Sequence, residues 1–336
     1  MPTNLIELRH LSREFMPQND VFTRLGRRLV GKGPLKSVQA VKAVSLELRS
    51  GETLAIVGES GCGKSTLGRM VAGILQPTAG QVFYKNQNVN TLDAKQRKAY
   101  ELSVQMIFQD PFASLNPRMR VLDCIGEAAV VHGLVSKAGQ EAFVVDLMLK
   151  VGLDPATRLR YPHQFSGGQR QRIGIARALA LRPVAIVCDE AVAALDVSIQ
   201  AQVLNLFKSL QQELGLSYVF ISHNLGVVSH IADRVAIMYL GRIVETADVE
   251  TLFSHARHPY TQALLSELPR LRAAKRDFIP IKGELPSPLD PPAGCAFHPR
   301  CPRAFEPCYT SRPELQSLAD SGVGHQSACH ANHMNV

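Results

Sequence analysis

The sequence lacks tryptophan, and aromatic residues make up only 6% of its 336 residues. It also lacks an apolar run of the ~18–20 residues that a membrane-spanning helix needs. The first residues, 1–7, have neither the basic nor the apolar region of a signal peptide. We therefore expect a protein that stays in the cytoplasm, where its seven cysteines are thiols or metal ligands rather than disulfides.

Basic residues outnumber acidic ones, and the formal net charge at pH 7 is +8. Part of this excess lies in one Gly-containing segment near the N-terminus, at Arg24, Arg27, Arg28, Lys32 and Lys36. A positive excess is typical of proteins that bind nucleic acid or membrane surfaces, but no nucleic-acid-binding motif accompanies it. We interpret the segment as a solvated insertion loop, and contact with acidic lipid headgroups or a membrane partner is the alternative.

Residues 58–66 form the first motif with a definite chemistry. Their sequence, Gly-Glu-Ser-Gly-Cys-Gly-Lys-Ser-Thr, fits the phosphate-binding pattern G-x-x-x-x-G-K-[ST], and it lies between an apolar run at 53–57 and a helix-forming stretch at 67–72. A glycine loop at a helix N-terminus directs backbone N–H groups and the helix dipole at a phosphate. Lys64 can reach the β- and γ-phosphates, and the Ser65 hydroxyl can bind Mg²⁺. The predicted nucleotide contacts are Gly58, Ser60, Gly61, Gly63, Lys64, Ser65 and Thr66.

Two adjacent acids, Asp189 and Glu190, end the apolar strand predicted at 184–188. A carboxylate downstream of a phosphate loop can hold Mg²⁺, and the next one can polarise the attacking water. We assign Asp189 as a ligand of the metal and Glu190 as the general base. The alternative is two acids at a strand end on the surface, which the pairing with a phosphate loop disfavours.

Ser166, Gly167, Gly168 and Gln169 open a second predicted helix. They offer further free backbone N–H groups and a hydroxyl suited to a γ-phosphate. A second such terminus is unexpected in a monomer but fits a dimer in which each chain completes the other's site. An ordinary helix N-cap with flexible glycines is the alternative.

Strands and helices alternate around the phosphate loop, which predicts a parallel sheet flanked by helices. Between about 111 and 165 the chain is mostly helix-forming, which indicates a helical insertion. Prolines cluster beyond about residue 268, where we expect a separate irregular tail. The predicted division is a nucleotide-binding domain at 1–268 and an extension at 269–336. Other strands are predicted at 5–8, 41–48, 80–84, 104–109 and 218–222, and helices at 169–181 and 198–214.

These motifs, together with Gln109, Asp196 and His223, resemble in order and spacing the nucleotide-binding subunit of ABC transporters over roughly residues 4–250. The resemblance implies an ABC-type P-loop NTPase fold, in which an antiparallel β subdomain accompanies the parallel core sheet. It also implies an active ATPase that uses ATP and Mg²⁺ and works as a head-to-tail dimer. In that dimer each ATP lies between the phosphate loop of one protomer and residues 166–168 of the other.

The same resemblance assigns roles to the remaining residues. Gln109 senses the γ-phosphate and the attacking water and contributes to the Mg²⁺ site, and His223 hydrogen-bonds the γ-phosphate. Asp196 lies across the dimer interface. Phe15 stacks on adenine, although an aromatic at this position could equally belong to the core.

Finer resemblance points to the ATPases of dipeptide and oligopeptide importers, on the basis of residues 108–117, 196–203 and 258–261 and of the tail. It implies a motor subunit that pairs with an identical or paralogous ATPase beneath two membrane permeases, served by an extracytoplasmic binding protein. The chain would then lie peripherally on the cytoplasmic face of the inner membrane, without nucleic acid as a partner. The sequence does not identify the transported ligand, because that ligand contacts other subunits of the transporter.

Two other functions compete with the importer. A soluble ABC-type ATPase acting on DNA or ribosomes usually carries two nucleotide domains, a long coiled-coil insertion or a nucleic-acid module, and none is visible here. A catalytically inactive paralogue is disfavoured by Lys64, Glu190 and His223. However, Ala191 stands where the family has proline and Ala193 where it has serine, which loosens a turn and removes a hydroxyl. We expect an active ATPase with altered coupling.

Four cysteines, Cys295, Cys301, Cys308 and Cys329, lie in the proline-rich tail. Four thiolates can enclose a zinc ion or a [4Fe–4S] cluster. Their intervals are wider than those of the usual zinc pairs, which favours iron–sulfur, and the importer resemblance agrees. Buried or free thiols in a poorly ordered tail are the alternative.

Overall fold

The structure is a computed structural model, and it describes residues 4–16, 37–268, 281, 283–318 and 324–332. The basic segment that contains Arg24 to Lys36 lies outside these residues. The described strands are β1 (Asn4–Phe15), β2 (Val38–Arg49), β3 (Thr53–Val57), β4 (Ala79–Tyr84), β5 (Gln87–Asn88), β6 (Val104–Ile107), β7 (Ala185–Asp189), β8 (Ser217–Ser222), β9 (Arg234–Tyr239), β10 (Arg242–Asp248), β11 (Gln316–Ser317) and β12 (Gln326–Ser327). The described α-helices are α2 (Lys64–Val71), α3 (Ala94–Ser103), α4 (Pro111–Ser114), α5 (Val121–Val131), α6 (Gln140–Lys150), α7 (Gly167–Leu179), α8 (Val197–Leu214), α9 (Leu225–Ile231), α10 (Val249–His255), α11 (Pro259–Ser266) and α12 (Glu306–Thr310).

The main sheet has the strand order β11-β12-β10-β9-β3-β8-β7-β6 within the described chain. The run from β9 to β6 is parallel, whereas β10, β12 and β11 continue the sheet in antiparallel pairs. All five residues of β3 are buried, as expected for a central parallel strand covered on both faces. The predicted parallel core is therefore confirmed.

A smaller antiparallel sheet, β2-β1-β4-β5 in the described residues, lies beside the main sheet. Its strands β1 and β2 pair along most of their length with several bulges. This sheet is the antiparallel subdomain that the ABC resemblance implied. Its apolar face shares one hydrophobic core with α2 and β3, which includes Leu46, Ile56 and Leu67.

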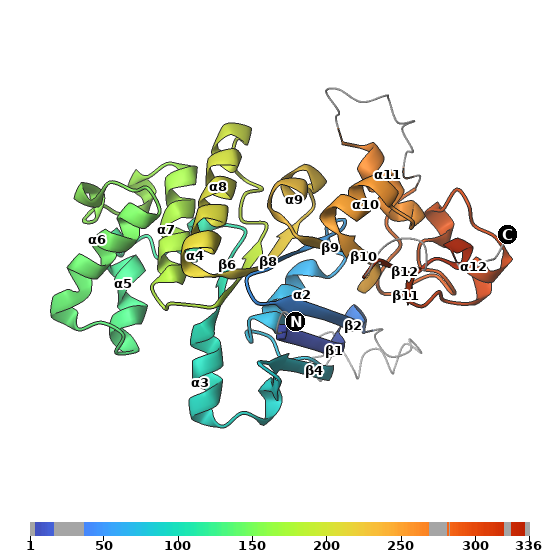
Figure 1. The fold of residues 1–336 in the computed structure, drawn as a ribbon, viewed down its shortest axis with the longest axis horizontal. Helices are drawn as coiled ribbons and strands as arrows, with labels where there is room; N and C mark the ends of the chain where they lie inside the picture. The colour runs from blue at the N-terminus through green and yellow to red at the C-terminus, as the bar shows by residue number, and fades with distance from the viewer. Residues whose placement is uncertain (1–3, 17–36, 269–280, 282, 319–323, 333–336) are drawn as a thin grey trace, which may run out of the picture.

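The helices α5, α6 and α7 gather at one end of the molecule, away from the smaller sheet (Figure 1). They form one core with β7 and β8, which includes Ile125, Met148 and Ile173. The helical insertion expected at about 111–165 thus contains α4, α5 and α6. Among the described helices, none is long and apolar enough to cross a membrane.

The C-terminal segment lies at the opposite end of the molecule from this helical insertion (Figure 1). We expected a separate irregular tail, but β12 pairs with β10 and so joins the main sheet. The buried carboxylate of Glu245 on β10 lies 2.8 Å from Nε2 of His325, just before β12. Phe297, 2% exposed, packs its ring against Tyr239 and Tyr260. Apolar burial and strand pairing therefore attach the described part of the extension to the core.

The attachment of the C-terminal extension to the core should depend most on the side chain of Phe297. We expect Phe297→Ala to lower the free energy of unfolding by about 3–5 kcal/mol, because it leaves a cavity among buried rings. The measurement is thermal or urea unfolding of the full chain. As a control, Leu289→Ala removes a side chain that is 45% exposed and should change stability by less than about 0.5 kcal/mol. Equal stability of the two variants would contradict the attachment described here.

Candidate active site

The phosphate loop, residues 58–66, connects β3 to α2 and is fixed by close backbone contacts. A Cβ on Gly58 would lie 2.1 Å from the carbonyl oxygen of Met238, and one on Gly63 would lie 2.2 Å from that of Ala40. Gly63 also has φ of +110°, in the region that favours glycine. Only glycine therefore fits at these two positions, which is the packing reason for the motif.

The amine of Lys64 is held inside this loop. It donates hydrogen bonds to the carbonyl oxygens of Gly58 at 2.8 Å and Glu59 at 3.0 Å. Lys64 is buried, while Ser60 and Gly61 at the tip of the loop are exposed, and Ser65 and Thr66 are partly buried. The loop thus keeps its cation next to the backbone N–H groups that would surround a phosphate.

Ser65 and Asp189 meet although they are far apart in sequence. The Ser65 hydroxyl donates to Oδ1 of Asp189 at 2.8 Å, because α2 begins beside the carboxyl end of β7. Burial raises the pKa of Asp189, and the Ser65 hydrogen bond only partly offsets it. A divalent cation here would favour the ionised carboxylate. Ser65 and Asp189 are two of the three residues that the sequence predicted for the Mg²⁺ site; the third, Gln109, donates to Glu190 instead.

Glu190 lies at the centre of a small polar cluster. Nε2 of Gln109 donates to its Oε2 at 2.8 Å, and Nδ1 of His223 lies 3.3 Å from its Oε1. The side chain of Glu190 is 11% exposed, and its φ of +48° is unusual for a residue with a Cβ. Strained backbone of this kind persists where the surroundings fix it, and it is concentrated at functional sites. The structure therefore brings together the three residues predicted to be catalytic.

Ala191 and Ala193 follow Glu190 in a turn that stays closed without proline. The N–H of Ala193 donates to the carbonyl of Glu190 at 3.0 Å, and Ala191 is buried. The Glu190 carboxylate keeps both of its partners. In this structure the two substitutions leave the cluster assembled, and their effect on coupling stays a prediction.

The N-terminus of α7 forms a complete capping box. The Ser166 hydroxyl accepts from the N–H of Gln169, and the side chain of Gln169 accepts from the N–H of Ser166. Gly167 faces Leu195, just before α8, and Gly168 faces Ile199 in the first turn of α8. In the part of the chain that the structure describes, no hydrogen bond or ion pair joins this terminus to the phosphate loop. The structure thus shows an ordered, capped helix end, and its role as a second phosphate-binding site stays a prediction.

Two further predicted residues are accessible. Phe15, at the end of β1, is 40% exposed, and the guanidinium of Arg13 lies 4.9 Å from its ring centre. Asp196 is an exposed N-cap residue of α8, and its side chain makes no capping hydrogen bond. Phe15 is thus not a core residue, and its ring can stack on another flat group.

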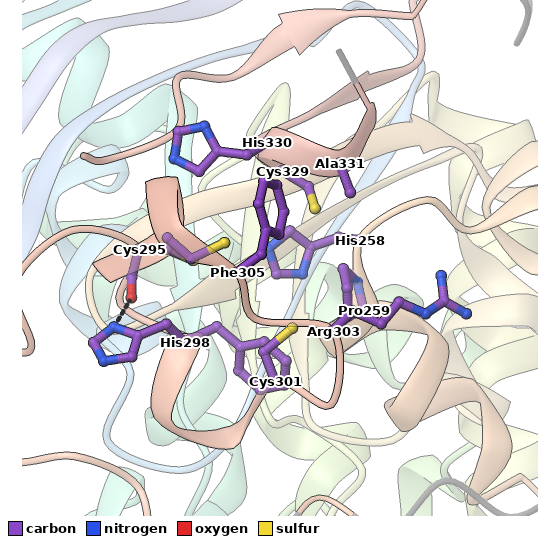
Figure 2. Close-up of a pocket in the computed structure, with 12 residues that line it drawn as sticks. His258, Pro259, Cys295, His298, Cys301, Arg303, Phe305, Cys329, His330 and Ala331 are labelled. Carbon is purple, nitrogen blue, oxygen red and sulfur yellow. Dashed lines mark hydrogen bonds between the residues drawn. The ribbon is translucent and has the colours of Figure 1, made fainter. Parts of the chain in front are cut away.

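The four tail cysteines line one cavity of about 20 Å³, together with His258, His298 and His330 (Figure 2). Burial, reinforced by the neighbouring thiols, raises the pKa of Cys295 to about 11. Within the described ranges, no three His, Cys, Asp or Glu side chains are arranged so that they could hold a metal ion. The fold thus brings the four thiols to one place without forming a metal-binding geometry.

Sequence reasoning missed three residues around the phosphate loop. Arg300 forms an ion pair with Glu59, and the Tyr260 hydroxyl accepts a hydrogen bond from the Glu59 N–H. Arg300 directly precedes Cys301 in the extension, and no motif connects it to a loop so far away in the sequence. Only the packing of the extension shows this link.

Comparisons with known proteins agree with this geometry. Residues 41–193 match the family "ABC transporter", and residues 244–308 match "Oligopeptide/dipeptide transporter, C-terminal region". The chain is 52% identical over 299 residues to the dipeptide transport ATP-binding protein DppF of Escherichia coli, covering 89% of this chain and 88% of that protein. It is 51% identical over 302 residues to the putative oligopeptide transport ATP-binding protein YkfD of Bacillus subtilis, covering 89% and 91%.

A solved structure shows the same fold. The dimeric structure of MJ0796, a bacterial ABC transporter cassette, matches with a TM-score of 0.62 at 25% identity, over 73% of this chain and 98% of that one. The resemblance inferred from the motifs is therefore confirmed. The chain belongs to the ABC-type ATPases and, among them, to the ATP-binding proteins of the oligopeptide and dipeptide transporters.

Proposed function

We propose that this chain is the ATP-hydrolysing motor subunit of an importer that takes up peptides across the cytoplasmic membrane. The observation that carries the proposal is the cluster in which Glu190 contacts both Gln109 and His223 beside the Ser65–Asp189 pair. The names of two relatives support peptides as the transported ligand: their sequences are 51% and 52% identical to this chain, and they are named for oligopeptide and dipeptide transport.

The positions of these residues support a separate role for each of them in ATP binding and hydrolysis. The loop N–H groups and Lys64 would bind the phosphates of ATP, while Ser65 and Asp189 would hold Mg²⁺, which would supply positive charge beside those phosphates. Glu190 accepts a proton from the attacking water, and Gln109 and His223 orient that water and the γ-phosphate. All of these side chains lie at the carboxyl ends of parallel strands, where such sheets bind ligands.

Each active site would be completed by a second copy or a paralogue. Ser166, Gly167 and Gly168 would bind the γ-phosphate of the partner's ATP through the free N–H groups of α7. Their capping box holds that helix end in place. The exposed Asp196 is the N-cap residue of α8, the helix whose Ile199 faces Gly168. Phe15 would stack on adenine. ATP would then close the dimer, and hydrolysis would reopen it.

The closing and opening would be transmitted to other subunits. Two permeases would bind the helical segment α4–α6, and an extracytoplasmic binding protein would deliver the peptide. The chain would then sit peripherally on the cytoplasmic face of the inner membrane. This arrangement rests on the family to which the chain belongs and on the names of its relatives.

Replacing the proposed base tests the motor function. Glu190→Gln should lower kcat for ATP hydrolysis at least ~100-fold, because general-base catalysis is lost while the side-chain shape is kept. The same variant should still bind ATP and give an ATP-dependent dimer in size-exclusion chromatography. The exposed Glu127→Gln should hydrolyse ATP like the unmodified chain. Full activity in Glu190→Gln would overturn the assignment of the base.

We further propose that Cys295, Cys301, Cys308 and Cys329 hold a [4Fe–4S] cluster. The donors fit in kind, because four thiols line one cavity, but among the described residues they are not arranged as a metal site, so binding the cluster would require them to move together. Such ligands bind as thiolates. Burial raises the pKa of Cys295 to about 11, so this thiol is protonated near pH 7 and a bound cation would favour its thiolate. The cluster would brace the extension, as structural metal sites do.

Metal analysis of the chain purified without oxygen tests this second proposal. We expect about four iron and four sulfide per chain, with the visible absorption of a cluster, and their loss in Cys301→Ser. Cys124→Ala, which removes a buried thiol outside the tail, should keep them. One zinc ion per chain, or no metal, would contradict the cluster.

A further inference from the structure

The cysteine-rich extension reaches directly into the phosphate loop through one arginine. Arg300 ends a short 3-10 turn, His298–Arg300, immediately before Cys301. Its Nη1 lies 2.9 Å and 3.1 Å from the two carboxylate oxygens of Glu59, the second residue of the loop. The Arg300 side chain is 7% exposed and that of Glu59 is 27% exposed. This ion pair is therefore largely shielded from water, unlike a surface pair of little energetic value.

Glu59 is held by all three of its polar groups. Its carboxylate accepts from Arg300, and its N–H donates to the hydroxyl of Tyr260 at 3.0 Å. Its carbonyl accepts from Lys64, the cation that must turn toward the phosphates. Tyr260 and Arg300 both lie in the segment that matches the C-terminal region of the peptide transporters. Among the described residues, Glu59 has four hydrogen-bond partners: Lys64 and the N–H of Cys62 within the loop, and Tyr260 and Arg300, which both lie in the C-terminal segment.

The position of Arg300 depends in turn on how the extension packs. The ring of Phe297, one turn earlier, packs against both Tyr239 and Tyr260, with its centre 5.4 Å from the centre of each ring. The Arg300 guanidinium also donates to the Tyr239 hydroxyl at 3.4 Å. Its Nε is buried without a partner among the described residues. Glu59 and Tyr239 are therefore the groups that compensate this buried guanidinium, and the pair should be sensitive to loss of either charge.

A restrained phosphate loop matters because ATP binding requires several N–H groups to point at one phosphate. A free glycine-rich loop loses conformational entropy when it adopts that arrangement, and a loop that is already held loses less. The hydrogen bonds of Arg300 go to Glu59 and Tyr239, which are not among the residues predicted to contact the nucleotide. The effect of Arg300 would therefore appear in nucleotide affinity more than in the chemical step.

We propose that Arg300 is a positioning residue of the nucleotide site, which acts with Tyr260 to hold Glu59 and thereby the phosphate loop in its binding conformation. The extension is then a structural part of the ATP site, and its folding state sets ATP affinity. This inference rests on the proposed ATP site at residues 58–66.

The test compares ATP affinity with turnover in the full chain. Arg300→Gln should weaken binding of a fluorescent ATP analogue and raise KM for ATP roughly tenfold, the loss expected for one charge-assisted hydrogen bond. The value of kcat should change less than about twofold, because the catalytic cluster is untouched. Arg300→Lys, which keeps the charge, should recover part of the affinity. A kcat effect without a KM effect would overturn the proposal.

A double-mutant cycle separates this role from general loss of stability. Glu59→Gln leaves the sequence of the extension intact and should weaken ATP binding as Arg300→Gln does. The double variant should be no weaker than either single one, because both remove the same pair. Additive losses would overturn the proposal. Arg312→Gln, at an exposed arginine of the same extension, should bind ATP like the unmodified chain; an equal loss there would also overturn it.

Failure of the inference and failure of the proposed ATP site give different results. If Lys64→Ala abolishes ATP binding while Arg300→Gln and Glu59→Gln leave it unchanged, the ATP site stands and the positioning role falls. If the unmodified chain binds no ATP analogue, the proposed site itself falls.

Discussion

The structure depends on how closely the phosphate loop packs against the main chain of two strands, one from each sheet. Gly58 lies against β9 and Gly63 against β2, at distances where no Cβ can be placed. Because β2 belongs to the smaller sheet and β9 to the main one, the loop fixes how the two sheets meet. The first turn of α2 then places Ser65 beside Asp189, and Lys64 stays within the loop. A substitution at either glycine would therefore disturb the sheets and the site together.

The catalytic cluster is a second case in which backbone geometry decides side-chain placement. Glu190 adopts a left-handed conformation at the end of β7, and its N–H still donates to Ile221 of the neighbouring strand. That combination turns the carboxylate toward Gln109 and His223, which follow two other strands. The strain is tolerated because buried strands surround it on both sides.

The C-terminal segment shows where local patterns stop being informative. Its prolines and widely spaced cysteines predicted irregular structure, and most of its described residues are irregular. Yet two short strands join the main sheet, a buried carboxylate meets His325, and Arg300 meets Glu59. Strands of two residues and single long-range ion pairs leave no periodic signal, so no pattern in the sequence could have predicted them.

The sequence by itself determined the parallel strands β3, β6, β7 and β8 and the helical insertion, and it predicted the residues of the site, because glycine loops, apolar runs and acids at strand ends each constrain their own local structure. Strand boundaries agreed to within a residue at β3 and β7. Only the tertiary structure decided which distant groups meet: Ser65 with Asp189, Glu190 with Gln109, and Arg300 with Glu59. Such contacts depend on the packing of whole elements, and packing is a property of the complete core rather than of any segment.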